Sequence, residues 1–457
     1  MRSGTASRAG DGPLSRDACG LDSIRDREIE TVSAHHIAAV ADYAWQRLAA
    51  DIEERSGFYR AKFAAAGVSA GSISDLADLG RLPLTTKDEI RETQEAEPPF
   101  GAHLGVHPSE VKRVYQTSGS SGHPSVIALT ATDCDTWTTI GARTYWTTGI
   151  HPHNSVLTTF GAGPFVAGHT HDTFDRIGVR RVPVGPGDTE RTLSALARGL
   201  ADTVLATPSF ALHLASVFDA RGVDGPSLGV RHLAVGGEPG GGIPAIRRRI
   251  EEAFGADVTE AGGIGDISPS LWGECPMKSG MHFCGQGMVW PELIDPVTEE
   301  TISIEPGAVG EIVYTTLVRE AMPLIRFRSR DVVEVIDTTC RCGRSSFRMK
   351  IAGRADDMFI VRGVNVYPSA IQAVVAEFEP LTTGRCRVVL PASAGVSVEP
   401  PINVDVETPE GSQLPPSLVD DVERSIRSKL IFRAAVSLVP QSTFGEAGYK
   451  TPPIIRR

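Results

Sequence analysis

Residues 115–124 read Tyr115-Gln-Thr-Ser-Gly-Ser-Ser-Gly-His-Pro124, a loop in which small hydroxyl side chains alternate with glycines. Glycines allow backbone N–H groups to converge on an anion, and hydroxyl groups add further donors. The stretch lacks the lysine of a Walker A motif, which excludes an ordinary P-loop site. Loops of this composition also serve as flexible linkers. Predicted structure on both flanks favours an anion-binding loop, formed by Thr117, Ser118, Gly119, Ser120, Ser121 and Gly122.

Around this loop the sequence predicts an α/β protein. Before it, apolar residues at helical spacing predict a helix over residues 35–65, and Thr86 is a predicted helix cap. After it, short apolar strands alternate with helical segments, which favours a parallel sheet with ligand sites at the carboxyl ends of its strands. The predicted strands are 155–159, 180–184, 203–206 and 232–235, and the predicted helices are 192–199, 208–218 and 243–254.

Two further regions differ from this alternation. From residue 283 to residue 334 the predicted strands are longer and separated by turns, which indicates an antiparallel, β-rich piece. After Gly353 a small βα unit follows, with a helix that begins at Pro368. We expect a flexible tail over residues 1–30, a large N-terminal domain over 31–352, and a small α+β C-terminal domain over 353–457.

Composition excludes several classes of protein. The 457 residues carry 45 Lys and Arg against 56 Asp and Glu, a net charge of −11 that disfavours nucleic acid and anionic membranes as partners. Inspection finds no apolar run long enough to span a bilayer and no apolar core of an export signal. Seven cysteines are too few for a disulfide scaffold and fit a reducing compartment. We therefore expect a cytoplasmic protein.

Three motifs follow the loop in a fixed order: Gly236-Gly-Glu-Pro239, Pro323-Leu-Ile-Arg-Phe-Arg-Ser-Arg-Asp331, and Gly353-Arg-Ala-Asp-Asp-Met-Phe-Ile-Val-Arg-Gly-Val-Asn-Val-Tyr-Pro368. Together with the loop they resemble the adenylate-forming superfamily, and within it the phenylacetate–CoA ligase-like branch, over roughly residues 80–457. The resemblance implies an N-terminal adenylate-forming domain with a mobile C-terminal lid. It also implies ATP, magnesium and coenzyme A as ligands, and a homodimer is possible.

The resemblance assigns roles to individual residues. The loop would hold the β- and γ-phosphates of ATP, and Gly236, Gly237, Glu238 and Pro239 would lie against adenine. Asp331, an acceptor when ionised, suits the two ribose hydroxyls, and Arg354 would reach ribose or phosphate. Asp356 occupies the hinge position, where the backbone would change conformation when the lid rotates. The alternatives are a plain strand-ending turn at 236–239, a solvated Asp331 and a surface ion pair of Arg354.

Two positions near the reacting phosphate need separate treatment. Lys450, in Gly448-Tyr-Lys-Thr-Pro-Pro453, is the candidate for the family's mobile lysine, although the surrounding text departs from the usual pattern and a solvated tail lysine is the alternative. The family's Tyr-Gly-x-Ser/Thr-Glu element is absent from Glu260-Ala-Gly-Gly-Ile-Gly-Asp-Ile-Ser-Pro269. Asp266 either replaces the missing glutamate as a magnesium ligand or caps a helix that begins at Ile267.

A cluster of cysteines and a histidine predicts a structural zinc site. Cys275, His282, Cys340 and Cys342 provide the Cys3His set of a closed tetrahedral site, and similar text occurs in zinc-carrying members of the branch. Cys284 is a spare ligand. The alternative is a set of buried free thiols.

A pocket for the acid is predicted between a strand and a helix, at Phe165, Gly168, His169 and His171. The resemblance then implies an AMP-forming ligase that adenylates a small carboxylic acid, aryl or arylacetic, releases pyrophosphate and transfers the acyl group to coenzyme A. Two alternatives stay open: an adenylating enzyme that uses an amine, a carrier protein or another acceptor (or activates nitrite), and a nucleotide-binding protein without turnover.

Overall fold

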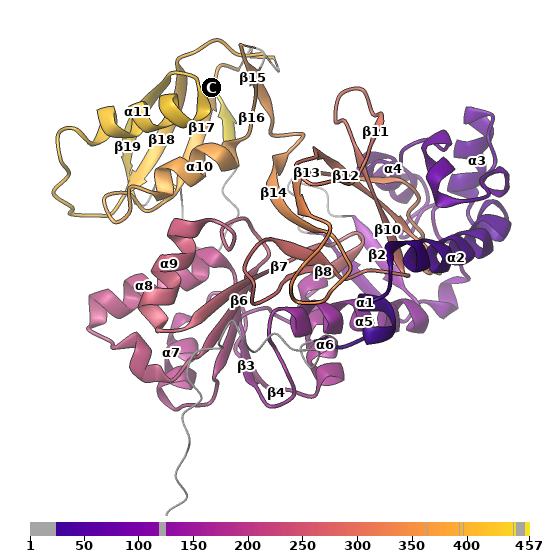
Figure 1. The fold of residues 1–457 in the computed structure, drawn as a ribbon, viewed down its shortest axis with the longest axis horizontal. Coiled ribbons are helices and arrows are strands. Elements are labelled where there is room, and N and C mark those ends of the chain that lie inside the picture. Colours follow the sequence, from indigo (N-terminus) through magenta and orange to yellow (C-terminus); the bar gives the residue numbers. More distant parts are fainter. Residues whose placement is uncertain are drawn as a thin grey trace, which may run out of the picture.

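The computed structural model describes residues 24–117, 125–362, 364–392, 394–395, 397–441, 443–444 and 453–457 (Figure 1). Its first part is helical, with α1 (Arg27–Glu30), α2 (Ala34–Arg55), α3 (Gly57–Ala66) and α4 (Lys87–Ala96). The helix predicted over 35–65 is two helices, because Ser56 has an extended backbone and its side chain caps α3. The predicted Thr86 cap is confirmed: Thr86 and Glu89 form a capping box at the start of α4.

The residues next to α1 correct one expectation. Residues 24–30 do not form a tail, since the Glu30 side chain is 2% exposed and forms an ion pair with the buried Arg344 at 2.9 Å. Ile24 is buried as well. A buried, fully paired carboxylate fixes this segment against the loop that follows β13.

A single sheet of twelve strands forms the large part of the molecule, in the order β11-β10-β12-β13-β14-β9-β8-β7-β6-β5-β3-β4. From β3 to β7 all pairs are parallel, and from β7 to β11 all are antiparallel. The predicted parallel region and β-rich piece therefore share one sheet. The strands are β3 (Ser155–Thr158), β4 (Arg180–Pro183), β5 (Thr203–Ala206), β6 (His232–Gly236), β7 (Asp257–Ile264), β8 (Ser268–Glu274), β9 (Met281–Phe283), β10 (Val289–Ile294), β11 (Thr301–Ile302), β12 (Val309–Thr316), β13 (Phe327–Asp337) and β14 (Arg348–Arg354).

The crossover helices follow from local sequence signals. Thr207 caps α8, Pro208 occupies its first position, and Gly222 ends it in the left-handed conformation. The strands β5 and β6 are buried along their whole length, so their continuous apolar runs pack against helices. These helices are α5 (Ala131–Thr147), α6 (Thr170–Ile177), α7 (Thr189–Ala197), α8 (Pro208–Arg221) and α9 (Pro244–Phe254). A separate antiparallel hairpin consists of β1 (Arg113–Gln116) and β2 (Val126–Leu129).

The C-terminal part has its own sheet and its own apolar core. Strands pair in the order β19-β18-β17-β20, and Figure 1 shows α10 and α11 beside this sheet, with α10 facing α9 of the large part. The elements are β15 (Phe359–Val361), β16 (Val364–Val366), α10 (Pro368–Ala376), β17 (Cys386–Leu390), β18 (Ile402–Thr408), α11 (Leu418–Leu430), β19 (Ala434–Pro440) and β20 (Ile454–Arg456). The strand β20 was not among the predicted elements. The domain division at residues 352/353 stays a prediction.

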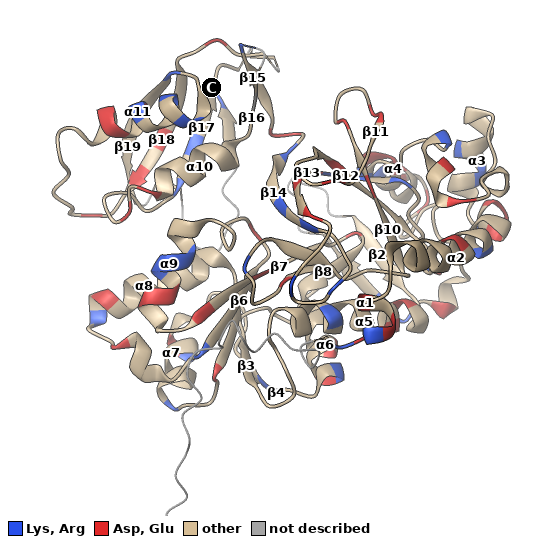
Figure 2. Ribbon diagram, viewed as in Figure 1, with Lys and Arg blue, Asp and Glu red and all other residues tan. Residues whose placement is uncertain are grey.

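Charged residues of both signs are interspersed over both parts of the chain (Figure 2). Within the described residues, no helix combines the length and the apolar character that crossing a membrane requires.

Candidate active site

The predicted phosphate loop connects β1 to β2, and hydrogen bonds close its base. The Thr117 N–H donates to the Ser125 carbonyl at 3.0 Å, and the Ser125 N–H donates to Thr117 Oγ1 at 3.1 Å. Both residues are buried. Thr117 thus holds the two ends of the loop together, whereas the other predicted loop residues, Ser118, Gly119, Ser120, Ser121 and Gly122, lie outside the described residues.

The predicted ribose and hinge residues form one ion-pair network. Arg354 lies at the end of β14, opposite Asp331 of β13, and its guanidinium donates to Asp331 Oδ1 at 2.8 Å. The same guanidinium holds Asp356 in a bidentate pair, with both distances 2.9 Å. Burial alone would lower the pKa of Arg354, but the hydrogen bonds to Asp356 and the charges of both carboxylates raise it. One cation therefore connects the predicted ribose carboxylate to the predicted hinge.

The predicted adenine segment follows directly from β6. A Cβ atom at Gly236 would lie 2.2 Å from the Ala261 carbonyl oxygen, so only glycine fits there. Gly237 has φ of +89°, which also favours glycine. The Glu238 carboxylate accepts a hydrogen bond from the Ser209 N–H at the start of α8, 2.7 Å away. The segment, including Pro239, has the backbone of a turn that ends β6. Its contact with adenine stays a prediction.

Asp266 lies in the turn between β7 and β8. The alternative of a helix cap is wrong, because residues 268–274 form a strand. Its Oδ2 is 2.9 Å from Lys87 Nζ, and the buried guanidinium of Arg319 donates to its backbone carbonyl. Asp266 is therefore already opposed by the Lys87 ammonium. A carboxylate oxygen is a suitable ligand for magnesium, and the magnesium role of Asp266 stays a prediction.

The predicted acid pocket separates into two environments. His169 is fully buried, with Nε2 3.0 Å from Thr138 Oγ1 and Nδ1 3.4 Å from the Tyr115 hydroxyl. Burial lowers its pKa to about 4, so the ring is neutral at physiological pH. His171 instead contacts Arg181 at 3.0 Å. The structure thus brings His169, but not His171, into the buried network.

The other two predicted pocket residues border this network. Phe165 is half exposed and pairs with Gln116 at the end of β1, which places it beside the base of the phosphate loop. Gly168 is buried, and a Cβ atom there would lie 3.3 Å from the Gly161 carbonyl oxygen. An aromatic ring next to a phosphate loop is a suitable wall for an apolar acid.

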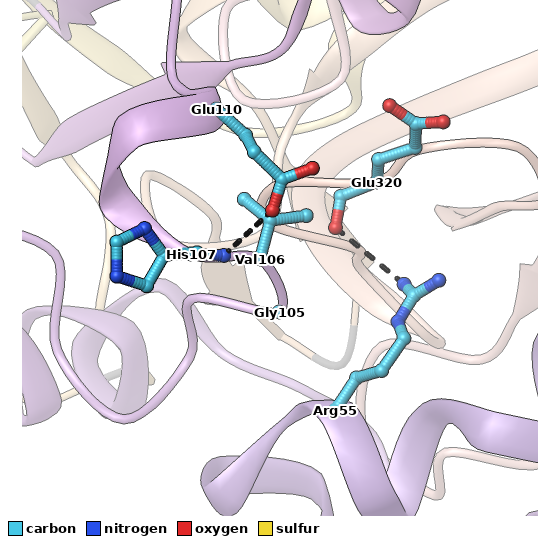
Figure 3. Close-up of a pocket in the computed structure, with 6 residues that line it drawn as sticks. All are labelled: Arg55, Gly105, Val106, His107, Glu110 and Glu320. Atoms are coloured by element: carbon cyan, nitrogen blue, oxygen red, sulfur yellow. Dashed lines mark hydrogen bonds between the residues drawn. The ribbon is translucent and has the colours of Figure 1, made fainter.

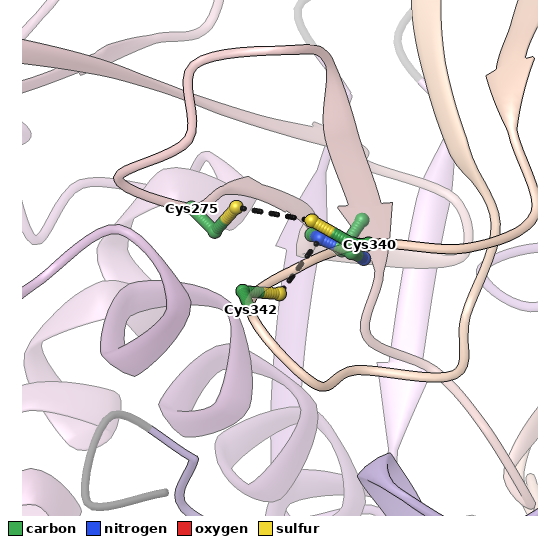
Figure 4. A group of neighbouring side chains, drawn as sticks. Cys275, Cys340 and Cys342 are labelled. Carbon is green, nitrogen blue, oxygen red and sulfur yellow. Dashed lines mark hydrogen bonds between the residues drawn. The ribbon is translucent and has the colours of Figure 1, made fainter. Parts of the chain in front are cut away.

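The four predicted zinc ligands converge, as Figure 4 shows for the cysteines. Their ligand atoms all lie within 4.8 Å of one another. Cys275 Sγ is 3.8 Å from Cys340 Sγ, and Cys342 Sγ is 3.4 Å from His282 Nε2. A tetrahedral zinc site places two sulfur atoms about 3.8 Å apart, and sulfur and nitrogen about 3.6 Å apart. The donor set therefore fits zinc in chemistry and spacing.

Neighbouring groups orient this cluster. His282 Nδ1 is 3.2 Å from the Ser346 carbonyl, which fixes the Nδ1–H tautomer and leaves Nε2 for a metal. Hydrogen bonding from Cys275 lowers the pKa of Cys340 and of Cys342, whereas hydrogen bonding with these two sulfurs raises the pKa of Cys275. Cys284 is not part of this set. Its thiol donates a hydrogen bond to the His282 carbonyl at 3.4 Å, and burial raises the pKa of the thiol to about 11.

Two features of the site were not predicted. Lys87, which directly follows the predicted cap Thr86, pairs with Asp266 across 179 positions of the sequence. Arg319 lies over the Trp137 ring, 5.2 Å from its centroid. The sequence places Lys87 at the first position of a capped helix. No spacing in the sequence indicates that its ion-pair partner is Asp266.

A separate hollow of about 450 Å³ opens on the surface between α2 and residues 105–110 (Figure 3). Its lining is polar and includes Arg55, His107 and Glu110. None of the lining residues belongs to the predicted site, so we assign no role to it.

The chain is similar to characterised ligases along most of its length, although no protein-family profile matches it. It is 35% identical to the phenylacetate–coenzyme A ligase of Thermus thermophilus over 352 residues, 76% of this chain and 77% of the relative. It is 31% identical to the phenylacetate–coenzyme A ligase of Escherichia coli, over 78% and 79% of the two chains.

The chain is also similar in structure to a solved CoA ligase. A 2-hydroxyisobutyryl-CoA ligase in the postadenylation state superposes with a TM-score of 0.84 at 28% identity, over 94% of this chain and 91% of the other. The same ligase in its thioesterification state gives a TM-score of 0.70 at 29% identity, over 96% and 93%. By the extent and identity of its sequence similarity, the chain belongs to the phenylacetate–coenzyme A ligase family of adenylate-forming enzymes.

Proposed function

We propose that this protein adenylates a small carboxylic acid with ATP and transfers the acyl group to coenzyme A, releasing pyrophosphate and then AMP. The observation that carries the proposal is the similarity to phenylacetate–coenzyme A ligases over more than three quarters of both chains. Phenylacetate or another aryl acid is the proposed substrate, and the half-exposed ring of Phe165 supports an apolar acid.

In the first half-reaction an acid oxygen attacks the α-phosphorus and the bond to pyrophosphate breaks. The residues proposed to act here bind and position: the loop that Thr117 closes holds phosphates, and Asp331 accepts the ribose hydroxyls. Arg354 orients Asp331 through the 2.8 Å ion pair. Lys450, outside the described residues, is proposed to stabilise the charge that develops on the α-phosphate.

In the second half-reaction the thiol of coenzyme A attacks the acyl carbon and AMP leaves. We propose that the C-terminal part reorients between the two steps, with Asp356 as the hinge. The higher TM-score against the postadenylation state than against the thioesterification state of the same ligase supports an arrangement suited to adenylation.

We further propose that zinc has a structural role. The Cys3His set is closed, so no position remains for a substrate. It would join β8 to the Cys340–Cys342 loop, across 65 positions of the sequence.

The experiment that tests the proposed activity is ATP–pyrophosphate exchange with a panel of acids that includes phenylacetate, benzoate and 2-hydroxyisobutyrate. We expect exchange with an aryl or arylacetic acid, and an acyl-CoA mass after coenzyme A is added. Pyrophosphate exchange without formation of an acyl-CoA thioester would indicate an acceptor other than coenzyme A. No exchange with any acid would contradict the proposal and favour nucleotide binding alone.

Replacing Asp331 by asparagine is expected to raise the KM for ATP roughly tenfold or more, because an amide lacks the charge that strengthens two ribose hydrogen bonds. The KM for the acid should change little. The matched control is Asp337→Asn, at the other end of the same strand, where the carboxylate is half exposed and pairs with Arg348. An unchanged KM for ATP in Asp331→Asn would remove the ribose assignment.

A further inference from the structure

A partly buried ion pair joins the C-terminal part to the large part, with the Arg249 side chain 29% exposed and the Glu379 side chain 8% exposed. Arg249 of α9 donates to Glu379 Oε2 at 2.9 Å, and its other amino group contacts Ser216 Oγ of α8 at 3.3 Å. Glu379 lies in the turn after α10, which ends at Ala376, and Figure 1 shows α10 facing α9. The contact therefore forms between two elements that the proposed hinge at Asp356 separates in the sequence.

The carboxylate in this pair is held in a restricted, water-poor place. Its side chain is 8% exposed, and burial raises its pKa despite the nearby guanidinium. A Cβ atom at Gly384 would lie 2.1 Å from Glu379 Oε1, so the glycine leaves room for the carboxylate to face α9. That oxygen is buried without a hydrogen-bond partner among the described residues. Arg249 thus supplies the interaction that offsets the loss of hydration.

An apolar contact accompanies the ion pair. Ala376, the last residue of α10, is 1% exposed and packs in the apolar cluster that includes Ile250 and Phe254 of α9 and Phe218 of α8. The other members of this cluster belong to the large part of the molecule. Ala376 and the Arg249–Glu379 pair therefore both contribute to the contact of α10 with α8 and α9.

The arrangement that contains this contact resembles one state of a related enzyme. The TM-score is 0.84 and 0.83 against two postadenylation structures of the 2-hydroxyisobutyryl-CoA ligase, but 0.71 and 0.70 against its open and thioesterification structures. Identity and coverage are nearly the same in all four comparisons. The structure is therefore more similar to the two postadenylation structures than to the open and thioesterification structures.

We propose that the Arg249–Glu379 pair is a positioning contact that holds the C-terminal part in the arrangement for adenylation and separates before thioester formation. The inference rests on the proposed function, since it assigns the contact to one of two half-reactions. Because a charge pair in a low-exposure interface is costly to break on one side, its loss shifts the population toward the other arrangement. Neither residue touches substrate in this account.

The test measures the two half-reactions separately in the full-length protein. Arg249→Met leaves Glu379 buried without its cation, so we expect acid-dependent pyrophosphate exchange to fall roughly tenfold, which corresponds to about 1.4 kcal/mol. Thioester formation from added acyl-adenylate and coenzyme A should stay equal or increase. Glu379→Gln should lower exchange as well, and the double variant should exchange faster than Arg249→Met, because it removes the uncompensated carboxylate.

Arg248→Met is the matched control, since Arg248 is the exposed neighbour on the same helix. It should leave both half-reactions unchanged. The inference would be overturned if the ratio of the adenylation rate to the thioesterification rate stayed the same in Arg249→Met and Glu379→Gln, whether both rates fall equally or neither changes. If the unaltered protein exchanges no pyrophosphate with any acid, the proposed function fails, whereas an active protein with an unmoved ratio contradicts only the positioning role.

Discussion

Replacing Lys450 by alanine is expected to slow acid-dependent pyrophosphate exchange roughly 100- to 1,000-fold. The physical reason is electrostatic, because negative charge develops on the α-phosphate oxygens as pyrophosphate leaves. Losing a single preorganised donor to such charge costs about that factor in other enzymes. The KM values for ATP and acid should change much less, since the interaction strengthens in the transition state. Initial rates at saturating ATP measure the effect.

The control for Lys450→Ala is Lys350→Ala. Lys350 lies on β14, where it forms a half-exposed ion pair with Glu334 at 2.9 Å, and its removal should leave exchange unchanged. Thioester formation from added acyl-adenylate should also continue in Lys450→Ala. Near-normal exchange in this variant would show that Lys450 is a solvated lysine with no part in the reaction.

The second large effect concerns the zinc cluster. We expect metal analysis of the purified protein to find about one zinc per chain, and Cys342→Ser to lose it. Since metal binding contributes directly to folding free energy at such sites, the onset of thermal unfolding should fall by roughly 10 °C or more, which is several kcal/mol. Adenylation at low temperature should persist, because the cluster offers no open position for substrate.

Cys134→Ser is the control for this substitution, because Cys134 lies on α5 and is outside the cluster. It should retain the metal and most of the stability. A protein that contains no zinc, or a Cys342→Ser variant that melts like the original, would mean that the thiols are simply buried.

Much of the fold could be predicted because local signals agree with the tertiary structure. The Thr86 cap and the Pro208 helix start are short-range features, and both occur where the sequence places them. The strands from β3 to β6 were predicted within one or two residues. Continuous apolar runs between helices indicate buried parallel strands at β3, β5 and β6, whereas β4 is an edge strand without a buried residue. The break at Ser56 was missed because the apolar periodicity continues across it.

Features that depend on distant partners could not be predicted. The strand β20 is only three residues long and pairs with β17 in parallel, a register that no local pattern indicates. Lys87 and Asp266 meet because α4 lies against the turn after β7, and the Arg249–Glu379 pair forms through the docking of α10 on α9. Such pairs depend on how elements are arranged in space. The convergence of Cys275, His282, Cys340 and Cys342 was predictable because these residue types are rare and chemically specific.

A single reaction that contains the protein, ATP, phenylacetate and coenzyme A tests the proposed activity most directly. We expect phenylacetyl-CoA, AMP and pyrophosphate in equal amounts, none of which forms when the acid is left out. An aryl acid that replaces phenylacetate with the same stoichiometry would agree equally well. ADP in place of AMP, or no AMP with any carboxylic acid, would contradict the central claim that this chain is an AMP-forming acid–CoA ligase.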